Sequence, residues 1–160
     1  MDEFQAKRLV EAYADMILRI SYQYLKQTHD AEDICQTVFL KYLTCAPDFD
    51  DFAHEKAWII RTAINACKDV LRSAHRRKTV SLEEADAATA PAVPDTEILD
   101  AVKQLPENYR ISIYLFYYEE YSAKEIAAIL GKSEGTVNQY LSRGRRKLRG
   151  YLTEEGSKIV

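Results

Sequence analysis

The feature of this sequence that most limits its fold is the scarcity of residues that interrupt helices. Only five glycines and four prolines occur among its 160 residues. No segment shows the strict alternation of apolar and polar residues that is typical of a half-buried strand, whereas apolar residues repeat with helical spacing along most of the chain. The sequence therefore predicts an all-α protein.

The first half of the chain is predicted to contain long helices joined by short connections. One helix covers about residues 3–26, and the next follows Asp30, a typical N-cap residue, and runs to about Thr44. A further helix is expected over about residues 55–77. Between the last two lies segment 45–54, which contains a proline and three aspartates and is therefore predicted to be a loop.

The composition of the chain changes after these helices. Residues 79–94 are rich in Ala, Glu and Asp and contain two prolines, which predicts a flexible acidic linker between domains 1–78 and 95–160. A short helix is expected over residues 95–105, and Pro106 suits the first turn of the helix that follows. The predicted architecture is thus two small helical domains joined by a flexible linker.

The clearest motif of the C-terminal domain is a pair of helices around a tight turn. Ser122 and Glu125 have the spacing of a capping box, and Gly131 is suited to end the first helix in the left-handed conformation. Ser133 can cap the second helix, and the small Gly144 is expected where a neighbouring element approaches closely. This arrangement is typical of a helix-turn-helix that lies in the major groove of DNA.

The outward face of the second helix of this motif carries the candidate DNA contacts. Side chains near its N-terminus would reach base edges, because amide groups pair with adenine, and the arginines would bind phosphates. The alternative interpretation is a solvated basic helix. The candidates are Glu134, Thr136, Asn138, Gln139, Ser142, Arg143, Arg145 and Arg146.

The formal net charge is −3, but basic and acidic residues are concentrated in different segments of the chain. Residues 56–78 contain seven basic residues and one acid, whereas residues 79–100 contain six acids and no base. Local patches rather than the total charge set the field that attracts nucleic acid. An acidic chain of this kind is therefore compatible with DNA binding.

Several classes of protein find no support in the sequence. The three cysteines form no CxxC pair and have no spacing with histidine that suits zinc, so we expect reduced thiols, no metal and no cofactor. No glycine-rich phosphate loop or nucleophile constellation is present, so we expect neither an enzyme nor a small-molecule substrate. No apolar run of membrane-spanning length and no signal peptide is found, and we therefore expect a cytoplasmic location.

Residues 30–40, 58–72 and 105–149, in this order, resemble segments of the extracytoplasmic-function (ECF) sigma factors, the dissociable promoter-recognition subunits of bacterial RNA polymerase. Residues 30–40, DAEDICQTVFL, resemble the acidic core-binding helix of region two. Residues 58–72 are similar to the helix that engages the minus-ten element, and residues 105–149 are similar to region four, which reads the minus-thirty-five element. The resemblance covers nearly the whole chain.

The resemblance implies core RNA polymerase, through its beta-prime clamp helices and beta flap, as a partner, together with promoter DNA and an anti-sigma factor. It also implies a core-binding face, for which the alternative is that Asp30 caps its helix and Asp33 complements the helix dipole. A different alternative for the whole chain is a stand-alone helix-turn-helix transcriptional regulator whose N-terminal helices form a dimer. The implied core-binding residues are Asp30, Glu32, Asp33, Gln36 and Phe39.

A second candidate DNA surface lies on the helix predicted over residues 55–77, where polar residues recur at spacings of four, three and four. Trp58, Ile59 and Val70 are expected to face the core, and the stripe is expected to face away from Trp58 and Ile59. The resemblance implies that it contacts the minus-ten DNA as the duplex opens and that the loop at residues 49–54 accepts an extruded base. Phe49 and Phe52 could instead fold back onto the core. The residues of the stripe are Arg61, Asn65, Lys68 and Arg72.

Overall fold

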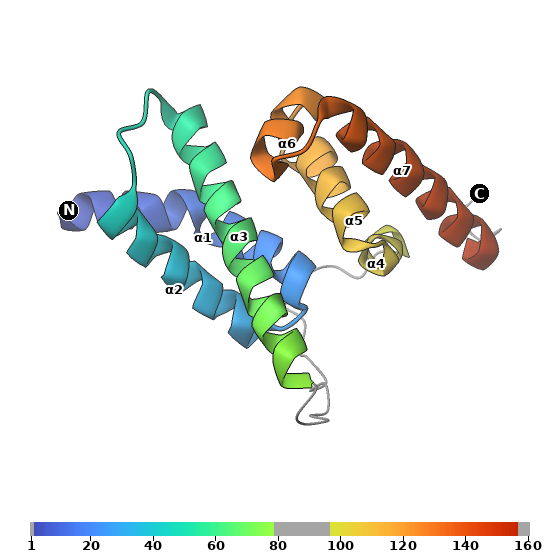
Figure 1. The fold of residues 1–160 in the computed structure, drawn as a ribbon, viewed down its shortest axis with the longest axis horizontal. Coiled ribbons are helices and arrows are strands. Elements are labelled where there is room, and N and C mark those ends of the chain that lie inside the picture. The colour runs from blue at the N-terminus through green and yellow to red at the C-terminus, as the bar shows by residue number, and fades with distance from the viewer. Residues whose placement is uncertain (1, 79–96, 157–160) are drawn as a thin grey trace. The chain divides into compact units, whose positions relative to one another are not determined.

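A computed structural model of the chain describes residues 2–78 and 97–156, and it describes side chains within residues 2–74 and 101–152. The chain divides into two compact units, Met1–Pro91 and Ala92–Val160. Every regular element within the described ranges is a helix, which confirms the all-α prediction (Figure 1). In those same ranges, no helix combines the length and the apolar content needed to cross a bilayer. The linker predicted over residues 79–94 lies outside the described residues.

The first unit consists of three helices that pack against one another, α1 (Glu3–Leu25), α2 (Thr28–Cys45) and α3 (Phe52–Lys78). The Asp2 side chain caps α1 by accepting a hydrogen bond of 2.8 Å from the backbone N–H of Gln5. The core of the unit is aliphatic, as the helical spacing of apolar residues predicts. Its buried members include Leu9, Met16, Ile17, Ile20, Ile34, Val38, Ile59, Ile60 and Ile64.

Two helices of this unit begin earlier than predicted. Asp30 was expected to be an N-cap, but α2 begins at Thr28 after Gln27 in an extended conformation, so Asp30 lies inside the first turn. There its carboxylate complements the positive end of the helix dipole. The helix α3 begins at Phe52 rather than near residue 55, because the Asp51 side chain accepts a hydrogen bond of 2.8 Å from the N–H of His54 and so caps the helix.

The prediction that Val70 faces the core was wrong, since 39% of its surface is exposed. Val70 lies on the same side of α3 as Ile59, so its place on the helix was interpreted correctly. However, it lies beside Asp30 at the start of α2, where it lines an open hollow together with Asp69, Ser73 and Ala74. The Val70 side chain is therefore only partly covered.

The second unit contains the predicted helix-turn-helix, formed by α6 (Ala123–Leu130) and α7 (Glu134–Gly156). The capping box of Ser122 and Glu125 is present, and Gly131 ends α6 with φ of 67°. The hydroxyl of Ser133 accepts a hydrogen bond of 3.1 Å from the N–H of Thr136 and so caps α7. The elements of the unit are α4 (Glu97–Gln104), α5 (Glu107–Ile113), the π-helical turn η1 (Tyr114–Tyr118), α6 (Ala123–Leu130) and α7 (Glu134–Gly156).

A close approach between α5 and α7 explains the glycine at position 144. A Cβ atom at Gly144 would lie 2.7 Å from Cδ1 of Ile113 and 3.4 Å from Cβ of Tyr109, whereas nothing lies within 4 Å of a Cβ at Gly150. We expect Gly144→Val to lower the free energy of unfolding of the second unit by about 1 to 3 kcal/mol through overpacking. The matched variant Gly150→Val should be nearly neutral, because glycine and valine differ by only a few tenths of a kcal/mol in helices.

Thermal or urea unfolding of the two glycine variants, followed by circular dichroism, measures this difference. Equal stabilities of the two variants would show that the contact between α5 and α7 at Gly144 is not tight.

Candidate nucleic-acid and partner interfaces

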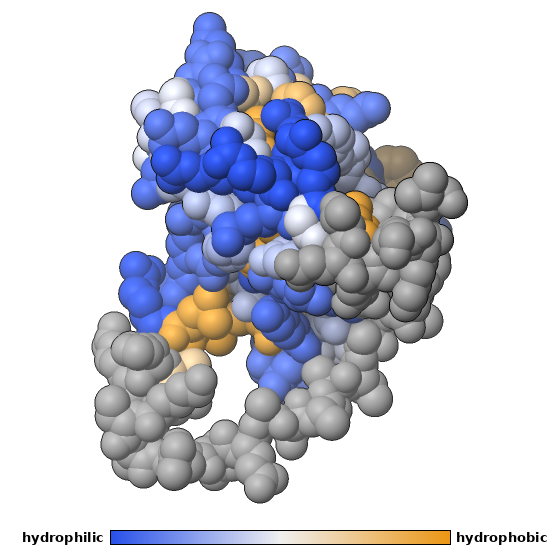
Figure 2. All heavy atoms as spheres, turned by 90° about the vertical axis from the view of Figure 1, so that its right-hand side faces the viewer, coloured by the Kyte–Doolittle hydropathy of each residue, from blue (hydrophilic) through white to orange (hydrophobic). Residues whose placement is uncertain are grey.

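Helix α7 presents one polar face to solvent and buries Val137 and Leu141 on the other. Figure 2 shows that hydrophilic side chains cover much of one face of the molecule, with apolar side chains between them. The polar and apolar faces of α7 follow from the helical spacing of polar and apolar residues in its sequence. Most of the predicted minus-thirty-five contacts are exposed here, namely Glu134, Asn138, Gln139, Ser142, Arg143 and Arg146.

The two remaining residues of that predicted set are held within the unit. The hydroxyl of Thr136 lies 2.8 Å from that of Ser133, so it takes part in the cap of α7. Nε of Arg145 donates a hydrogen bond of 2.6 Å to the hydroxyl of Tyr117, and its guanidinium lies 5.5 Å from the ring centre of Phe116. The hydrogen bond and the cation–π contact together restrict the side chain of Arg145. The structure thus separates Arg145 from its exposed neighbours, a distinction that sequence reasoning missed.

The predicted minus-ten stripe lies along one side of α3. Arg61, Asn65 and Arg72 are exposed and Lys68 is half-buried, and Arg72 forms an ion pair with Asp69 one turn away. The prediction that this stripe faces away from Trp58 was wrong. Positions three apart on a helix are neighbours, so the half-buried Trp58 lies next to Arg61 at the start of the stripe.

Four ring side chains meet where the loop after α2 joins the start of α3, and we call them the aromatic cluster: Tyr42, Phe49, His54 and Trp58. The ring centre of Phe49 lies 5.9 Å from those of Tyr42 and Trp58 and 5.1 Å from that of His54. Phe49 therefore packs on its own unit. Phe52 behaves differently, since it is 72% exposed and the guanidinium of Arg8 lies over its ring.

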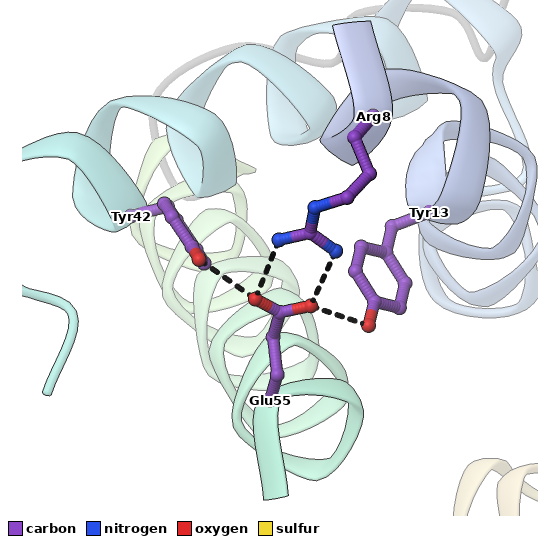
Figure 3. Close-up of polar contacts among 4 residues, drawn as sticks. All are labelled: Arg8, Tyr13, Tyr42 and Glu55. Atoms are coloured by element: carbon purple, nitrogen blue, oxygen red, sulfur yellow. Dashed lines mark hydrogen bonds and ion pairs between the residues drawn. The ribbon is translucent and has the colours of Figure 1, made fainter. Parts of the chain in front are cut away.

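The buried carboxylate of Glu55 contacts this cluster through Tyr42. Glu55 of α3 accepts two hydrogen bonds on each oxygen, and we call the group around it the carboxylate hub (Figure 3). Oε1 accepts from Nη1 of Arg8 at 3.1 Å and from the hydroxyl of Tyr13 at 2.7 Å. Oε2 accepts from Nη2 of Arg8 at 3.0 Å and from the hydroxyl of Tyr42 at 2.7 Å. The hub thus joins α1, α2 and α3.

The hub strongly favours the ionised form of the Glu55 carboxyl. Burial alone would raise its pKa, but the hydrogen bonds from Arg8, Tyr13 and Tyr42 outweigh burial and lower the pKa to about 2. The hydrogen bonds that Arg8 donates to Glu55 raise the pKa of Arg8. Burial and the hydrogen bond to Glu55 raise the pKa of Tyr42. Sequence reasoning missed Glu55. The available signal was Tyr13 on an inward helical face, because a buried tyrosine hydroxyl usually has a partner.

One face of α2 combines exposed polar and apolar side chains. Leu40 is 62% exposed and Leu43 is 56% exposed, which is unusual for leucines that lie close together on a helix. They share this face with polar residues at helical spacing, and of the predicted core-binding residues Asp30 and Phe39 are half-buried. We use the name α2 face for five exposed residues of this side of the helix: Glu32, Asp33, Gln36, Leu40 and Leu43.

A helix-turn-helix in one unit and an exposed polar stripe on a helix of the other unit are features that DNA-binding transcription proteins share. Residues 9–77 match the family described as Sigma-70 region 2, and residues 95–148 match the family described as Sigma-70, region 4. The chain is also 30% identical to the ECF RNA polymerase sigma factor SigW of Bacillus subtilis over 166 residues, covering 91% of this chain and 88% of SigW. The chain therefore belongs to the family of ECF RNA polymerase sigma factors.

Further comparisons agree with this assignment. The chain is 31% identical to the ECF RNA polymerase sigma factor SigE of Mycolicibacterium smegmatis over 95% of its length, although it spans only 63% of SigE. Its fold is similar to that of the sigma factor RpoE of Bartonella quintana, solved with the anti-sigma factor NepR, with a TM-score of 0.75, 21% identity and coverage of 95% of this chain and 99% of that chain. CnrH, solved with the cytosolic domain of CnrY, gives a TM-score of 0.70 at 22% identity, with coverage of 97% and 92%.

Proposed function

We propose that this chain binds core RNA polymerase and directs it to promoters, with residues 1–78 engaging the core and the minus-ten element and residues 95–160 engaging the minus-thirty-five element. The observation that carries the proposal is the match to both sigma-70 regions in one chain. For the same reason, a stand-alone regulator is not favoured. The protein would act by binding alone, in the cytoplasm, and leave the chemistry to the polymerase.

We assign core binding to the α2 face. A carboxylate patch there would orient the encounter with a basic surface, and the two exposed leucines would supply apolar area to bury. Asp30 and Phe39 flank this face and would contribute at its edges. The partner surface would be the beta-prime clamp helices, and the second unit would contact the beta flap.

The minus-thirty-five element would be read by the N-terminal part of α7. Asn138 and Gln139 carry exposed amides suited to adenine, and Glu134 and Ser142 extend the polar face. Arg143 and Arg146 would bind phosphates. Thr136 and Arg145 would take part through the positions that Ser133 and Tyr117 impose on them.

The minus-ten element would lie along the stripe Arg61, Asn65, Lys68 and Arg72. The stripe begins next to the aromatic cluster, so opened DNA could pass from a cationic surface to ring side chains on which a base can stack. We further infer that an anti-sigma factor regulates the chain. Among proteins of similar fold, RpoE was solved with the anti-sigma factor NepR, and CnrH was solved with the cytosolic domain of CnrY.

Transcription by core polymerase on a genomic promoter library tests the proposed function. Core enzyme with this protein should start transcripts at defined sites that core enzyme alone does not use, and the protein alone should bind the same DNA weakly. No gain in specific transcripts over core enzyme alone would contradict the proposal. A stand-alone regulator would instead protect a palindromic site as a dimer in the absence of polymerase.

Charge reversal on the α2 face tests the docking surface. Asp33→Lys should lower the affinity for core polymerase by about tenfold, because it places like charges opposite each other. Glu11→Lys on α1 is a matched control. Glu11 lies 3.9 Å from Lys7 one helical turn away, as Asp33 lies 3.9 Å from His29, and the two acidic side chains are 68% and 62% exposed. Surface plasmon resonance with immobilised core measures both affinities, and equal losses would contradict the assignment.

A further inference from the structure

We propose that Tyr42 is a positioning residue that holds the aromatic cluster in place for opened DNA by anchoring it to Glu55. The proposal rests on the proposed function of the first unit at the minus-ten element. Tyr42 belongs to both groups defined above, the carboxylate hub and the aromatic cluster. The hub holds the hydroxyl of Tyr42 in place, and the ring of Tyr42 thereby restricts the movement of the aromatic cluster.

The hydroxyl and the ring of Tyr42 make separate contacts. The hydroxyl donates a hydrogen bond of 2.7 Å to Oε2 of Glu55, which fixes the direction of the side chain. The ring stacks on Phe49 with centres 5.9 Å apart and meets the edge of Trp58 at 6.0 Å. Phe49 belongs to the connection between α2 and α3, so Tyr42 ties this segment to all three helices of the unit.

The polar contacts given for Asp50 and Asp51 of the connection are exposed to solvent, including the hydrogen bond by which Asp51 caps α3. The N–H of Asp50 donates to Nδ1 of His54 at 3.3 Å, and the side chain of Asp50 is 95% exposed. Exposed hydrogen bonds of this kind contribute little because water competes for them. The ring contacts of Phe49 with Tyr42, His54 and Trp58 therefore hold the segment, and among these rings Tyr42 is the one that Glu55 anchors.

Tyr13 supplies an internal comparison for this role. Its hydroxyl donates to the same carboxylate at the same distance of 2.7 Å, through Oε1. Tyr13 lies on α1 and is 7% exposed, and it is not a member of the aromatic cluster. Tyr42→Phe and Tyr13→Phe thus each remove one hydrogen bond of 2.7 Å to the same carboxylate, while only the first releases a ring that touches Phe49 and Trp58.

The first measurement uses the free protein and does not depend on the proposed function. Trp58 is the single tryptophan of the chain, so its fluorescence reports the aromatic cluster alone. We expect Tyr42→Phe to shift the emission of Trp58 and to increase its quenching by acrylamide about twofold, as the cluster loosens. Tyr13→Phe should leave both unchanged. Identical spectra and quenching for the wild type and Tyr42→Phe would overturn the proposal.

The second measurement uses the holoenzyme on a promoter found in the transcription experiment. Permanganate reactivity of thymines in the minus-ten region should fall about five- to tenfold in Tyr42→Phe, in line with the loss of one hydrogen bond. Affinity for core polymerase should stay unchanged, which separates positioning from general destabilisation. Tyr13→Phe should open the promoter normally. Equal losses of opening in both variants would overturn the proposal, since the hub would then act only through stability.

The two measurements fail in distinguishable ways. If no promoter is found, the proposed function fails while the fluorescence result still tests the link between Glu55 and the cluster. If promoters open normally in Tyr42→Phe despite a changed Trp58 signal, the positioning role is wrong and the proposed function stands.

Discussion

Glu55→Gln is expected to lower the free energy of unfolding of the first unit by about 3 kcal/mol at neutral pH. The amide cannot accept four hydrogen bonds as the carboxylate does, and the guanidinium of Arg8 loses its ionic partner. Urea unfolding followed by Trp58 fluorescence measures this unit by itself. Asp15→Asn, at an exposed position of α1, is the control and should change stability by less than about 0.5 kcal/mol.

The same carboxylate gives the first unit a defined dependence on pH. The pKa of Glu55 is lowered from 4.5 to about 2 on folding, so its contribution is fully present above the unfolded value. That contribution declines as pH falls below about 5 and is lost near pH 2, whereas Glu55→Gln removes this part of the dependence. The free energies of unfolding of the wild type and the variant should therefore converge as the pH falls from about 5 to about 2. A constant difference between them over this range would contradict the assigned pKa.

The double variant Arg143→Ala, Arg146→Ala is expected to weaken binding of the holoenzyme to promoter DNA on the order of thirtyfold at physiological salt. Both side chains are exposed on the polar face of α7. Each neutralised phosphate changes the slope of log affinity against log salt by about 0.9, so the slope should decrease in magnitude by about 2. Fluorescence anisotropy of labelled promoter DNA across a salt series measures both effects.

A matched control for the arginine variant is Lys7→Ala, which removes an exposed cation from α1, outside the proposed DNA surfaces. It should leave the affinity and the salt slope unchanged. The arginine variant should also weaken binding to unrelated DNA by a similar factor, because phosphate contacts carry no sequence information. A loss confined to the promoter sequence would assign these arginines to base edges instead.

Features of the fold that depend on neighbouring residues could be predicted from the sequence. The capping box of Ser122 and Glu125, the left-handed Gly131 and the cap at Ser133 are all present, since each links residues within one turn. Gly144 was also predicted correctly as a site of close approach. The starts of α2 and α3 were less predictable, because several polar residues compete for the cap and backbone geometry selects among them.

In the candidate site, too, the sequence predicted features that depend on residues close together in the chain and missed contacts between distant residues. Helical spacing placed Asn138, Arg143 and Arg146 on one exposed face, and this part of the prediction agrees with their exposure. The contact of Arg145 with Tyr117 joins residues 28 positions apart, and the bonds of Glu55 to Tyr13 and Arg8 span 42 and 47 positions. No local pattern indicates which distant partner such a side chain meets.

The sequence by itself determined the all-α class, the helix-turn-helix and the family, because these depend on apolar periodicity, on caps and on motifs that each occupy a continuous segment. Only the tertiary structure decided that Glu55 is a buried centre shared by three helices, that Tyr42 connects it to the aromatic cluster, and that Arg145 packs against aromatic rings. The physical reason is that these contacts form only when helices distant in sequence pack together, and their energies depend on the burial that this packing creates.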